Sequence, residues 1–381
     1  MTQDRRTDRS GPATIELNRP AAAPRPASPR RWWIAPVLAA CLLLGAAAPT
    51  RPAAITGPPL PARAALLAAG GLLLVADATT LTGYTTTGRM TWRVPAPAGA
   101  WSAASVGDLV LVTTRDSAGQ VTGTSAYAAG TGQPRWRRPD RVQPAGAAAV
   151  AVTEVRGVAD PGRRRIQGAV RGVDLATGAD RWSTPVPSTA VLVAAPGRIV
   201  VVHDTGLARV YDVRHGVAIA ETRLPPAGYA PDNPLAVGDH LVLRHPAPGG
   251  TTLSGYDLPS LTPRWRLLLP VGETTAPGCP RLLCLVGLAD RRALDPDTGA
   301  QVWRWPGGAG WQPVPGDRDA TRQVLLRPGG DGRTLVVDVG ADGPHPGATL
   351  PAGIRDCHLV ADALACRGPD GRLTVRPAAG T

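Results

Sequence analysis

Residues 173–182, VDLATGADRW, predict the end of one strand, a tight turn and the start of the next strand. The Asp174 carboxylate can accept hydrogen bonds from the backbone after it, beginning with the N–H two residues on, and Gly178 tolerates the positive φ that such a turn requires. Thr177 stands between them, and Trp182 follows the glycine by four positions. The stretch is therefore a hairpin with an anchoring aromatic ring on its second strand.

A second copy of this stretch, residues 294–303, reads LDPDTGAQVW. Asp295, Thr298, Gly299 and Trp303 occupy the same four positions as in the first copy. Two copies of one hairpin indicate an internal repeat, and a repeat decides the architecture before any single motif does.

The anchoring tryptophan recurs along the chain, at Trp92, Trp136, Trp182, Trp265 and Trp303. One further copy, YDVRHGVAIA, has Ala220 where the ring should stand, and Leu261 replaces the glycine before Trp265. With that copy included, the steps are 44, 46, 38, 45 and 38 residues. Such steps, with four short strands in each, are typical of β-propeller blades. A large ring at each blade edge would fill the wedge between neighbouring blades.

The number of blades follows from the strand sets, which end near Pro95, Pro139, Pro187, Pro225, Pro270, Pro306 and Pro351. Residues 355–377 then supply only three more strands. Residues 53–61 are the natural donor of the missing strand, because closing the ring also removes an exposed strand edge. We therefore expect an all-β protein, a propeller of eight four-stranded blades. A ring of seven blades with a terminal hairpin is the alternative.

The N-terminal region differs from the repeats in composition. Residues 1–31 hold seven Arg and a Pro-rich stretch with almost no apolar pattern, which predicts a disordered tail. Residues 32–48 then run without a charge, from a Trp pair at one edge. That length just spans a hydrocarbon core, and the preceding Arg excess predicts a cytoplasmic tail.

The predicted domains are thus a cytoplasmic tail (1–31), a single transmembrane signal anchor (32–50) and an extracytoplasmic propeller (51–381). A cleaved signal peptide is one alternative to the anchor, although its charged region would be unusually long. A lipoprotein is another, because Cys41 ends a lipobox-like LAAC, but apolar residues follow this cysteine. All three interpretations place the propeller outside the cytoplasm, and the anchor would hold it at the cell membrane.

The remaining cysteines favour the same compartment. Cys279 and Cys284 flank a short turn, as do Cys357 and Cys366, which would oppose each other if their turn centres on residues 361–362. Two local pairs in a chain poor in cysteine are typical of disulfides in an oxidising space. The alternative, a four-thiolate zinc site, does not suit these spacings.

The closing Asp-x-x-Thr-Gly-x-x-x-Trp of each repeat resembles the PQQ-like repeat of the quinoprotein-alcohol-dehydrogenase-like propellers. In size the chain is especially similar to the outer-membrane assembly factor B group. The resemblance covers roughly residues 66–376; it is strong at residues 174–182 and 295–303 and fades at VDVGADG from Val337. It implies a propeller fold, but fold alone does not determine function.

The resemblance raises the question of a quinone cofactor. Quinone-dependent dehydrogenases are much longer and carry an adjacent Cys-Cys disulfide and a calcium ion held by acidic and amide ligands. This sequence has no Cys-Cys pair, and its only asparagines are Asn18, in the tail, and Asn233. We therefore expect no bound cofactor and no metal. Motifs of serine hydrolases, P-loop proteins and zinc proteases are also absent from the sequence, so we expect no enzyme.

Charge gives one further candidate. The chain has a formal net charge of +12, and Arg163, Arg164 and Arg165 form a run in a long insertion of the third repeat. Such a patch could hold an anionic lipid, a wall polymer or an acidic partner, or it is simply a solvated basic loop. Nucleic acid is not expected for an outward-facing domain without a recognition motif.

These observations predict a membrane-anchored extracytoplasmic propeller that acts as a non-catalytic protein-binding or assembly scaffold, with its partner at a propeller face. The alternative is a degenerate quinoprotein-like propeller that binds a small ligand or acts as an oxidoreductase through the central funnel. The sequence does not indicate the oligomeric state.

Overall fold

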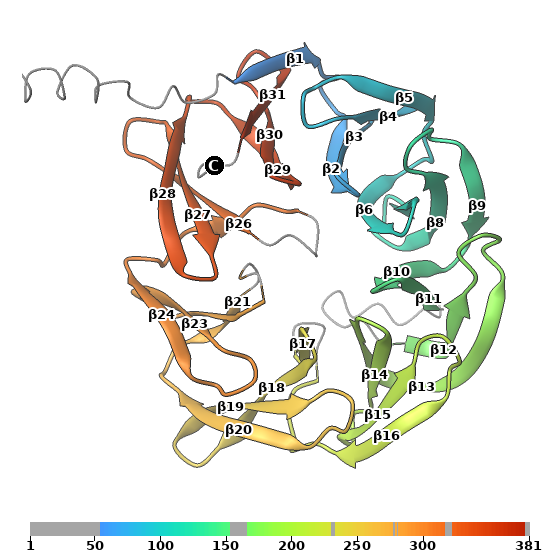
Figure 1. Ribbon diagram of the computed structural model, residues 1–381, viewed down its shortest axis with the longest axis vertical. Helices are drawn as coiled ribbons and strands as arrows, with labels where there is room; N and C mark the ends of the chain where they lie inside the picture. Colours follow the sequence, from blue (N-terminus) through green and yellow to red (C-terminus); the bar gives the residue numbers. More distant parts are fainter. Residues whose placement is uncertain are drawn as a thin grey trace, which may run out of the picture. The chain divides into compact units, whose positions relative to one another are not determined.

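The computed structural model describes residues 54–152, 166–229, 233–276, 279, 281–316 and 322–377. All regular elements in these residues are β-strands, and they form eight four-stranded antiparallel blades around a central axis (Figure 1). The prediction of an eight-bladed all-β propeller is thereby confirmed, and the alternative of seven blades is wrong.

The first four blades follow the chain in order, with the first strand of each nearest the axis (Figure 1). Blade 1 contains β2 (Ala65–Ala69), β3 (Leu72–Ala76), β4 (Thr80–Tyr84) and β5 (Met90–Pro95); blade 2 contains β6 (Ala100–Val106), β7 (Leu109–Arg115), β8 (Val121–Ala128) and β9 (Pro134–Arg138). Blade 3 contains β10 (Arg141–Ala145), β11 (Ala148–Val152), β12 (Ile166–Val173) and the first part of β13 (Asp180–Ala195); blade 4 contains the rest of β13, β14 (Arg198–Val202), β15 (Leu207–Asp212) and β16 (Ala218–Arg223).

The remaining blades repeat the pattern. Blade 5 contains β17 (Leu235–Val237), β18 (His240–Ala247), β19 (Gly250–Asp257) and β20 (Pro263–Leu269); blade 6 contains β21 (Thr274–Ala276), β22 (Leu283–Val286), β23 (Asp290–Leu294) and β24 (Gln301–Pro306). Blade 7 contains β25 (Gln312–Pro313), β26 (Gln323–Pro328), β27 (Thr334–Gly340) and β28 (Gly343–Leu350); blade 8 contains β29 (Arg355–Val360), β30 (Ala363–Arg367), β31 (Arg372–Pro377) and β1 (Ile55–Pro59).

The ring is closed by the start of the described chain. β1 pairs antiparallel with β31, with Ile55 opposite Val375, and so supplies the outer strand of blade 8. Figure 1 shows β1 (blue) beside β31 (red). The prediction that residues 53–61 supply the missing strand is confirmed. Without this strand, β31 would be left as an open edge.

Arg367 ties this closure together from the buried side. Its guanidinium is 1% exposed and donates from Nη1 to the Pro61 carbonyl (3.0 Å) and from Nη2 to the Ala64 carbonyl (2.7 Å). Its Nε bonds Asp356 Oδ2 at 3.0 Å. The link that leads from β1 into blade 1 is therefore held by two bonds from one side chain of blade 8, and the third bond ties that side chain to its own blade.

The two ends of the propeller differ in their loops. Because the strands of each blade are antiparallel, the turns between first and second and between third and fourth strands lie at one end, here called the turn end. The turns between second and third strands and the connections between blades lie at the other, here called the connection end. The Asp-x-x-Thr-Gly turns are all at the turn end.

The core consists of apolar clusters between blades, such as the one built on Val200, Val202, Leu241 and Leu243 from blades 4 and 5. Apolar and polar residues do not alternate regularly along these strands, because both faces of a blade pack against neighbouring blades. The predicted tail, the anchor and their boundaries lie outside the described residues, within which no helix is long and apolar enough to cross a membrane.

Candidate functional site

The repeat residues join neighbouring blades. Gly178 of blade 3 lies against the Trp136 ring of blade 2, so closely that a Cβ on this glycine would be 2.7 Å from the ring. Trp182 of blade 3 lies in the same way against Gly216 of blade 4. The glycine and tryptophan of one motif therefore contact different blades.

Each ring is also enclosed within its own blade by a small residue across the strand pair. Trp182 is opposite Gly172, and Trp136 is opposite Ala126. Each ring therefore lies between two small residues, one from each blade, and fills the wedge between the blades.

The indole N–H adds a polar bond to this joint. Trp182 Nε1 donates to the Val213 carbonyl at 2.9 Å, and the same bond joins Trp92 to Ala129, Trp136 to Leu175 and Trp265 to Pro296, each at 2.8 Å. In every case the acceptor stands three residues before the turn glycine of the next blade. A full-length turn in the next blade therefore satisfies the buried donor.

The joint between blades 6 and 7 lacks this bond. β27 and β28 are joined by only two residues, at the sequence where the motif fades, so no carbonyl reaches the Trp303 indole. Trp303 is 8% exposed, and its Nε1 has no acceptor among the described residues.

The aspartates of the motif stabilise their own turns. Asp174 Oδ1 accepts from the backbone N–H of Ala176 (3.1 Å) and Thr177 (3.0 Å), and Arg181 Nη2 binds Asp174 Oδ2 at 2.8 Å. The hydrogen bond from Arg181 and then those from Thr177 hold the pKa of Asp174 below its usual range. Asp295 caps its turn through Asp297 and Thr298 in the same way. The carboxylates of both motifs are therefore occupied in capping their own turns.

Both predicted disulfides are present. Cys279 is bonded to Cys284 in blade 6, and Cys357 to Cys366 between β29 and β30, whose turn is centred on residues 361–362. The four sulfurs are therefore used in pairs in two different blades. Across the described part of the chain, no three His, Cys, Asp or Glu side chains gather as they would to hold a metal ion.

Asn233 does not suit the calcium ligand of quinone enzymes. Its Nδ2 donates to the Gly228 and Arg244 carbonyls at 3.0 and 2.8 Å, and its Oδ1 accepts from the Arg244 N–H at 2.8 Å. The side chain is 6% exposed and is occupied in holding the backbone before blade 5. Asn233 therefore does not fit the amide ligand of a quinone-bound calcium ion.

A pocket of about 510 Å³ opens on the central channel. Its walls come from the beginnings of the first strands of four successive blades, 7, 8, 1 and 2, so it lies towards the connection end. Trp101, which is 45% exposed, forms one wall. Gln312, Asp356 and His358 also line it. The sequence analysis missed this pocket, although Trp101 stands outside the register of the repeat tryptophans.

Apolar side chains are exposed at the connection end of blade 6. Val271, between β20 and β21, is 94% exposed, and Leu288, between β22 and β23, is 85% exposed. The two loops touch, since a Cβ on Gly272 would be 3.1 Å from Leu288 Cγ. Leu268, at the end of β20, is 54% exposed. We call Leu268, Val271 and Leu288 the blade-6 apolar patch. In the sequence, this patch is marked by apolar residues that stand in loops rich in Gly and Pro.

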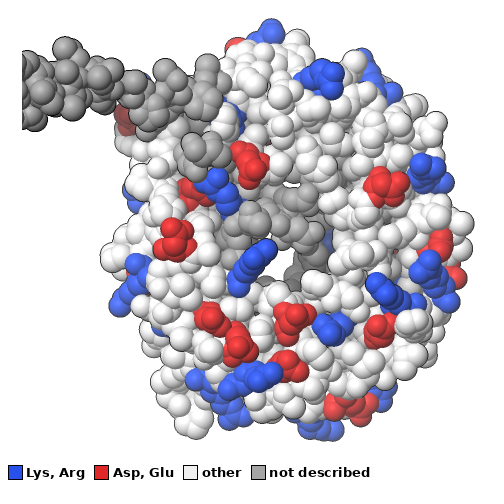
Figure 2. Space-filling model, in the orientation of Figure 1, with Lys and Arg blue, Asp and Glu red and all other residues white. Residues whose placement is uncertain are grey.

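Charge is mixed on the face seen in Figure 2, where basic and acidic side chains alternate around the ring and form no single-sign patch. Ion pairs among the described residues include Arg292 with Glu273 (2.6 Å) and Arg198 with Asp239 (3.0 Å). The Arg163–Arg165 run lies outside the described residues, so its role stays a prediction.

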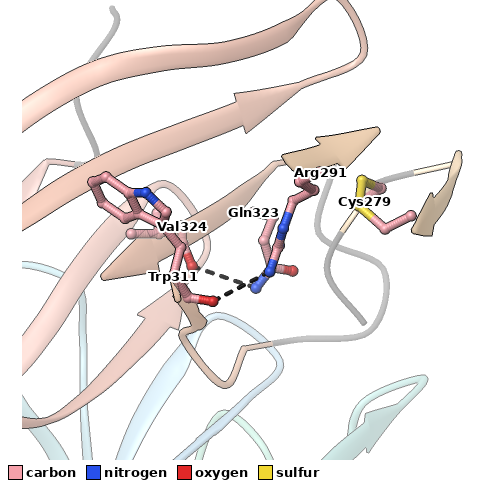
Figure 3. The surroundings of a disulfide bond; sticks show 6 residues. Cys279, Arg291, Trp311, Gln323 and Val324 are labelled. Carbon is pink, nitrogen blue, oxygen red and sulfur yellow. Dashed lines mark hydrogen bonds between the residues drawn. A yellow bond between two sulfur atoms is a disulfide. The ribbon is translucent and has the colours of Figure 1, made fainter. Parts of the chain in front are cut away.

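One arginine of blade 6 is buried without a counter-ion. Arg291, 2% exposed, donates from Nη2 to the Trp311 carbonyl at 3.2 Å, as Figure 3 shows beside the Cys279 disulfide. Its Nε and Nη1 have no acceptor among the described residues, and burial lowers the pKa of the guanidinium.

The eight blades, the Trp–Gly joints and the capped turns define a β-propeller of the PQQ-like class. The family described as outer membrane protein assembly factor BamB matches residues 50–243, just over half of the chain, and the chain belongs to this family. No curated protein matches the sequence.

Among solved structures, the chain is similar to BamB from Moraxella catarrhalis, with 18% identity, a TM-score of 0.52, and coverage of 86% of this chain and 99% of that one. It is also similar to the computationally designed Ika8 protein (13% identity, TM-score 0.52, 84% and 98% covered). The C-terminal WD40 domain of Sif2 has 8% identity and a TM-score of 0.54, with 83% and 96% covered. At these identities the likeness shows the propeller fold alone.

Proposed function

We propose that this chain is a non-catalytic protein-binding scaffold that residues 32–50 hold at the outer side of a membrane. The family supports an assembly or interaction role, and the uncharged run after an Arg-rich tail supports the anchor. The partner contacts the connection end of the ring.

The blade-6 apolar patch is the observation that carries this proposal. Val271 and Leu288 are almost fully exposed on two loops that touch, and exposed apolar clusters mark protein-binding sites more often than isolated apolar residues do. Asp290, two residues after Leu288, pairs with the exposed Arg304, so a polar ion pair stands beside the apolar patch, as at the rim of an interface.

The test is crosslinking of the full-length protein in its native membrane, followed by quantitative mass spectrometry of the proteins that co-purify. A Val271→Asp/Leu288→Asp variant should lose the partner because both changes put a charge into the contact. The matched control is Val217→Asp, at a 59% exposed residue of the turn end, and it should retain the partner. Equal recovery from both variants, or no partner above background, would contradict the proposal.

A further inference from the structure

The channel pocket has the composition of a small-ligand site. Its volume, about 510 Å³, lies within the range of roughly 300–1,000 Å³ that such sites occupy. Apolar groups form about half of the exposed wall and include Leu66, Leu326 and the prolines that flank Val314. A few polar groups interrupt this wall, as in sites that orient a ligand.

These polar groups have unused hydrogen-bonding capacity. The Gln312 amide and the His358 imidazole make no hydrogen bond with the rest of the described chain. Asp356 uses Oδ2 for Arg367 and leaves Oδ1 without a donor there. Three side chains that can donate, accept, or do both therefore line one pocket. An entirely apolar ligand would strip water from them without replacing its hydrogen bonds.

The charges in and around the pocket are balanced. The Asp356 carboxylate is paired with Arg367, and burial lowers the pKa of His358, which favours the neutral imidazole. The Arg115 guanidinium lies over the Trp101 ring, 3.4 Å from its centroid. An organic cation on this ring would meet Arg115, and an anion would meet Asp356, so a neutral ligand fits best.

Trp101 supplies the apolar surface for such a ligand. Arg115 covers one face of the indole and fixes its orientation, while 45% of the residue remains exposed. The C–H groups on one face of a sugar ring carry slight positive charge and pack on the electron-rich face of an aromatic ring. Sugar hydroxyls both donate and accept, so they match the carboxylate, the amide and the imidazole at once.

We infer that the channel pocket binds a short neutral saccharide, with one sugar ring on Trp101 and hydroxyls on Gln312, Asp356 and His358. This site is separate from the blade-6 apolar patch, so the inference stands independently of the scaffold proposal.

The test uses full-length protein in detergent and three neutral probes: maltotriose, cellotriose and the trimer of N-acetylglucosamine. Saturation-transfer NMR detects binding, and calorimetry measures affinity. Trp101→Ala should weaken binding about tenfold or more, because it removes the stacking surface. Gln312→Ala should weaken it less, by the loss of one hydrogen bond. The Gln312 side chain makes no hydrogen bond with the described chain, so this substitution should not disturb the fold.

Val217→Ala is the control, at an exposed residue of the turn end outside the pocket, and it should bind as the wild type does. The inference is overturned if none of the three saccharides binds at millimolar concentration, or if Trp101→Ala leaves the affinity unchanged. It is also overturned if choline or inorganic phosphate binds in their place. The partner crosslinking is unaffected by any of these outcomes.

Discussion

Leu261 of blade 5 packs with Ala220 of blade 4 at the position where the other joints place a turn glycine against a tryptophan. Val210 stands opposite Ala220 in its blade, where the other joints have Gly or Ala. This joint thus differs from the others at three positions: the small Ala220 lies between the larger Val210 and Leu261, where the other joints have a large ring between two small residues. Leu261 keeps the turn at a φ of 56° and still donates its N–H to the Asp257 carbonyl.

This exchange predicts strong coupling between the three positions. Ala220→Trp alone should lower the free energy of unfolding by about 1–3 kcal/mol or more, because Val210 and Leu261 already fill the joint. The triple variant Val210→Gly/Ala220→Trp/Leu261→Gly restores the ordinary joint and should recover most of this loss. Urea unfolding of the single, double and triple variants measures the coupling. Additive effects would contradict the idea of one exchanged unit.

The indole hydrogen bonds predict a difference between two tryptophans of the same motif. Trp182→Phe removes the bond to the Val213 carbonyl, whereas Trp303→Phe removes none, because Trp303 Nε1 has no acceptor among the described residues. Both variants replace an indole by the same smaller phenyl ring. Trp182→Phe should therefore lower the free energy of unfolding by about 1–2 kcal/mol more than Trp303→Phe. Denaturant titration of the two variants decides this, and equal losses would refute it.

The sequence predicted the parts of the fold that depend on local order. Turn chemistry at Asp174 and Gly178, the blade step and both disulfides follow from residues close in sequence. The closing strand pairs Ile55 with Val375, far apart in the chain, and was predicted by counting the strands of each repeat. The contact between Gly178 and Trp136 could not be predicted in this way. A repeat gives the register of each blade but does not show which residues of the neighbouring blade pack against its tryptophan. The channel pocket was missed for a related reason. Trp101, Gln312 and Asp356 come from three blades and lie outside the repeated stretch, so only the closed ring brings them together.

Arg291 and Arg292 are neighbours with opposite expected effects. Arg291 is buried with two unpaired donors, so Arg291→Met removes a charge that has no compensating partner and should leave stability unchanged or raise it. Arg292 binds both oxygens of the buried Glu273, at 2.7 and 2.6 Å. Arg292→Met strands that carboxylate and should lower the free energy of unfolding by about 3 kcal/mol. Thermal unfolding of the pair is the measurement, and a larger loss from Arg291→Met would contradict the assignment.

The buried His358 should make the protein less stable as the pH falls. Burial lowers its pKa from the ordinary 6.5, and the nearby Asp356 opposes this only in part. Because the folded pKa is the lower one, the unfolded chain binds the proton more readily. The stabilising contribution is present above the unfolded pKa and is lost as the pH falls through the folded value.

His358→Gln cannot gain this proton, so it should lose less stability than the wild type between about pH 7 and about pH 5. Denaturant midpoints measured across this range test the prediction. An unchanged slope for His358→Gln would show that this group does not titrate on unfolding.

Arg367 should govern the closure of the ring. Arg367→Met leaves the Pro61 and Ala64 carbonyls without their donors and leaves Asp356 without its ion pair, so we expect a loss of about 3–5 kcal/mol. The loss should be local, because the bonds join blade 8 to the link between β1 and blade 1. Hydrogen exchange read by mass spectrometry should therefore show faster exchange in β1 and β31 than in blades 3 and 4. Arg372→Met, at an exposed residue of β31, should leave both regions as in the wild type. Uniformly faster exchange in all eight blades would mean that Arg367 supports the whole ring and not its closure alone.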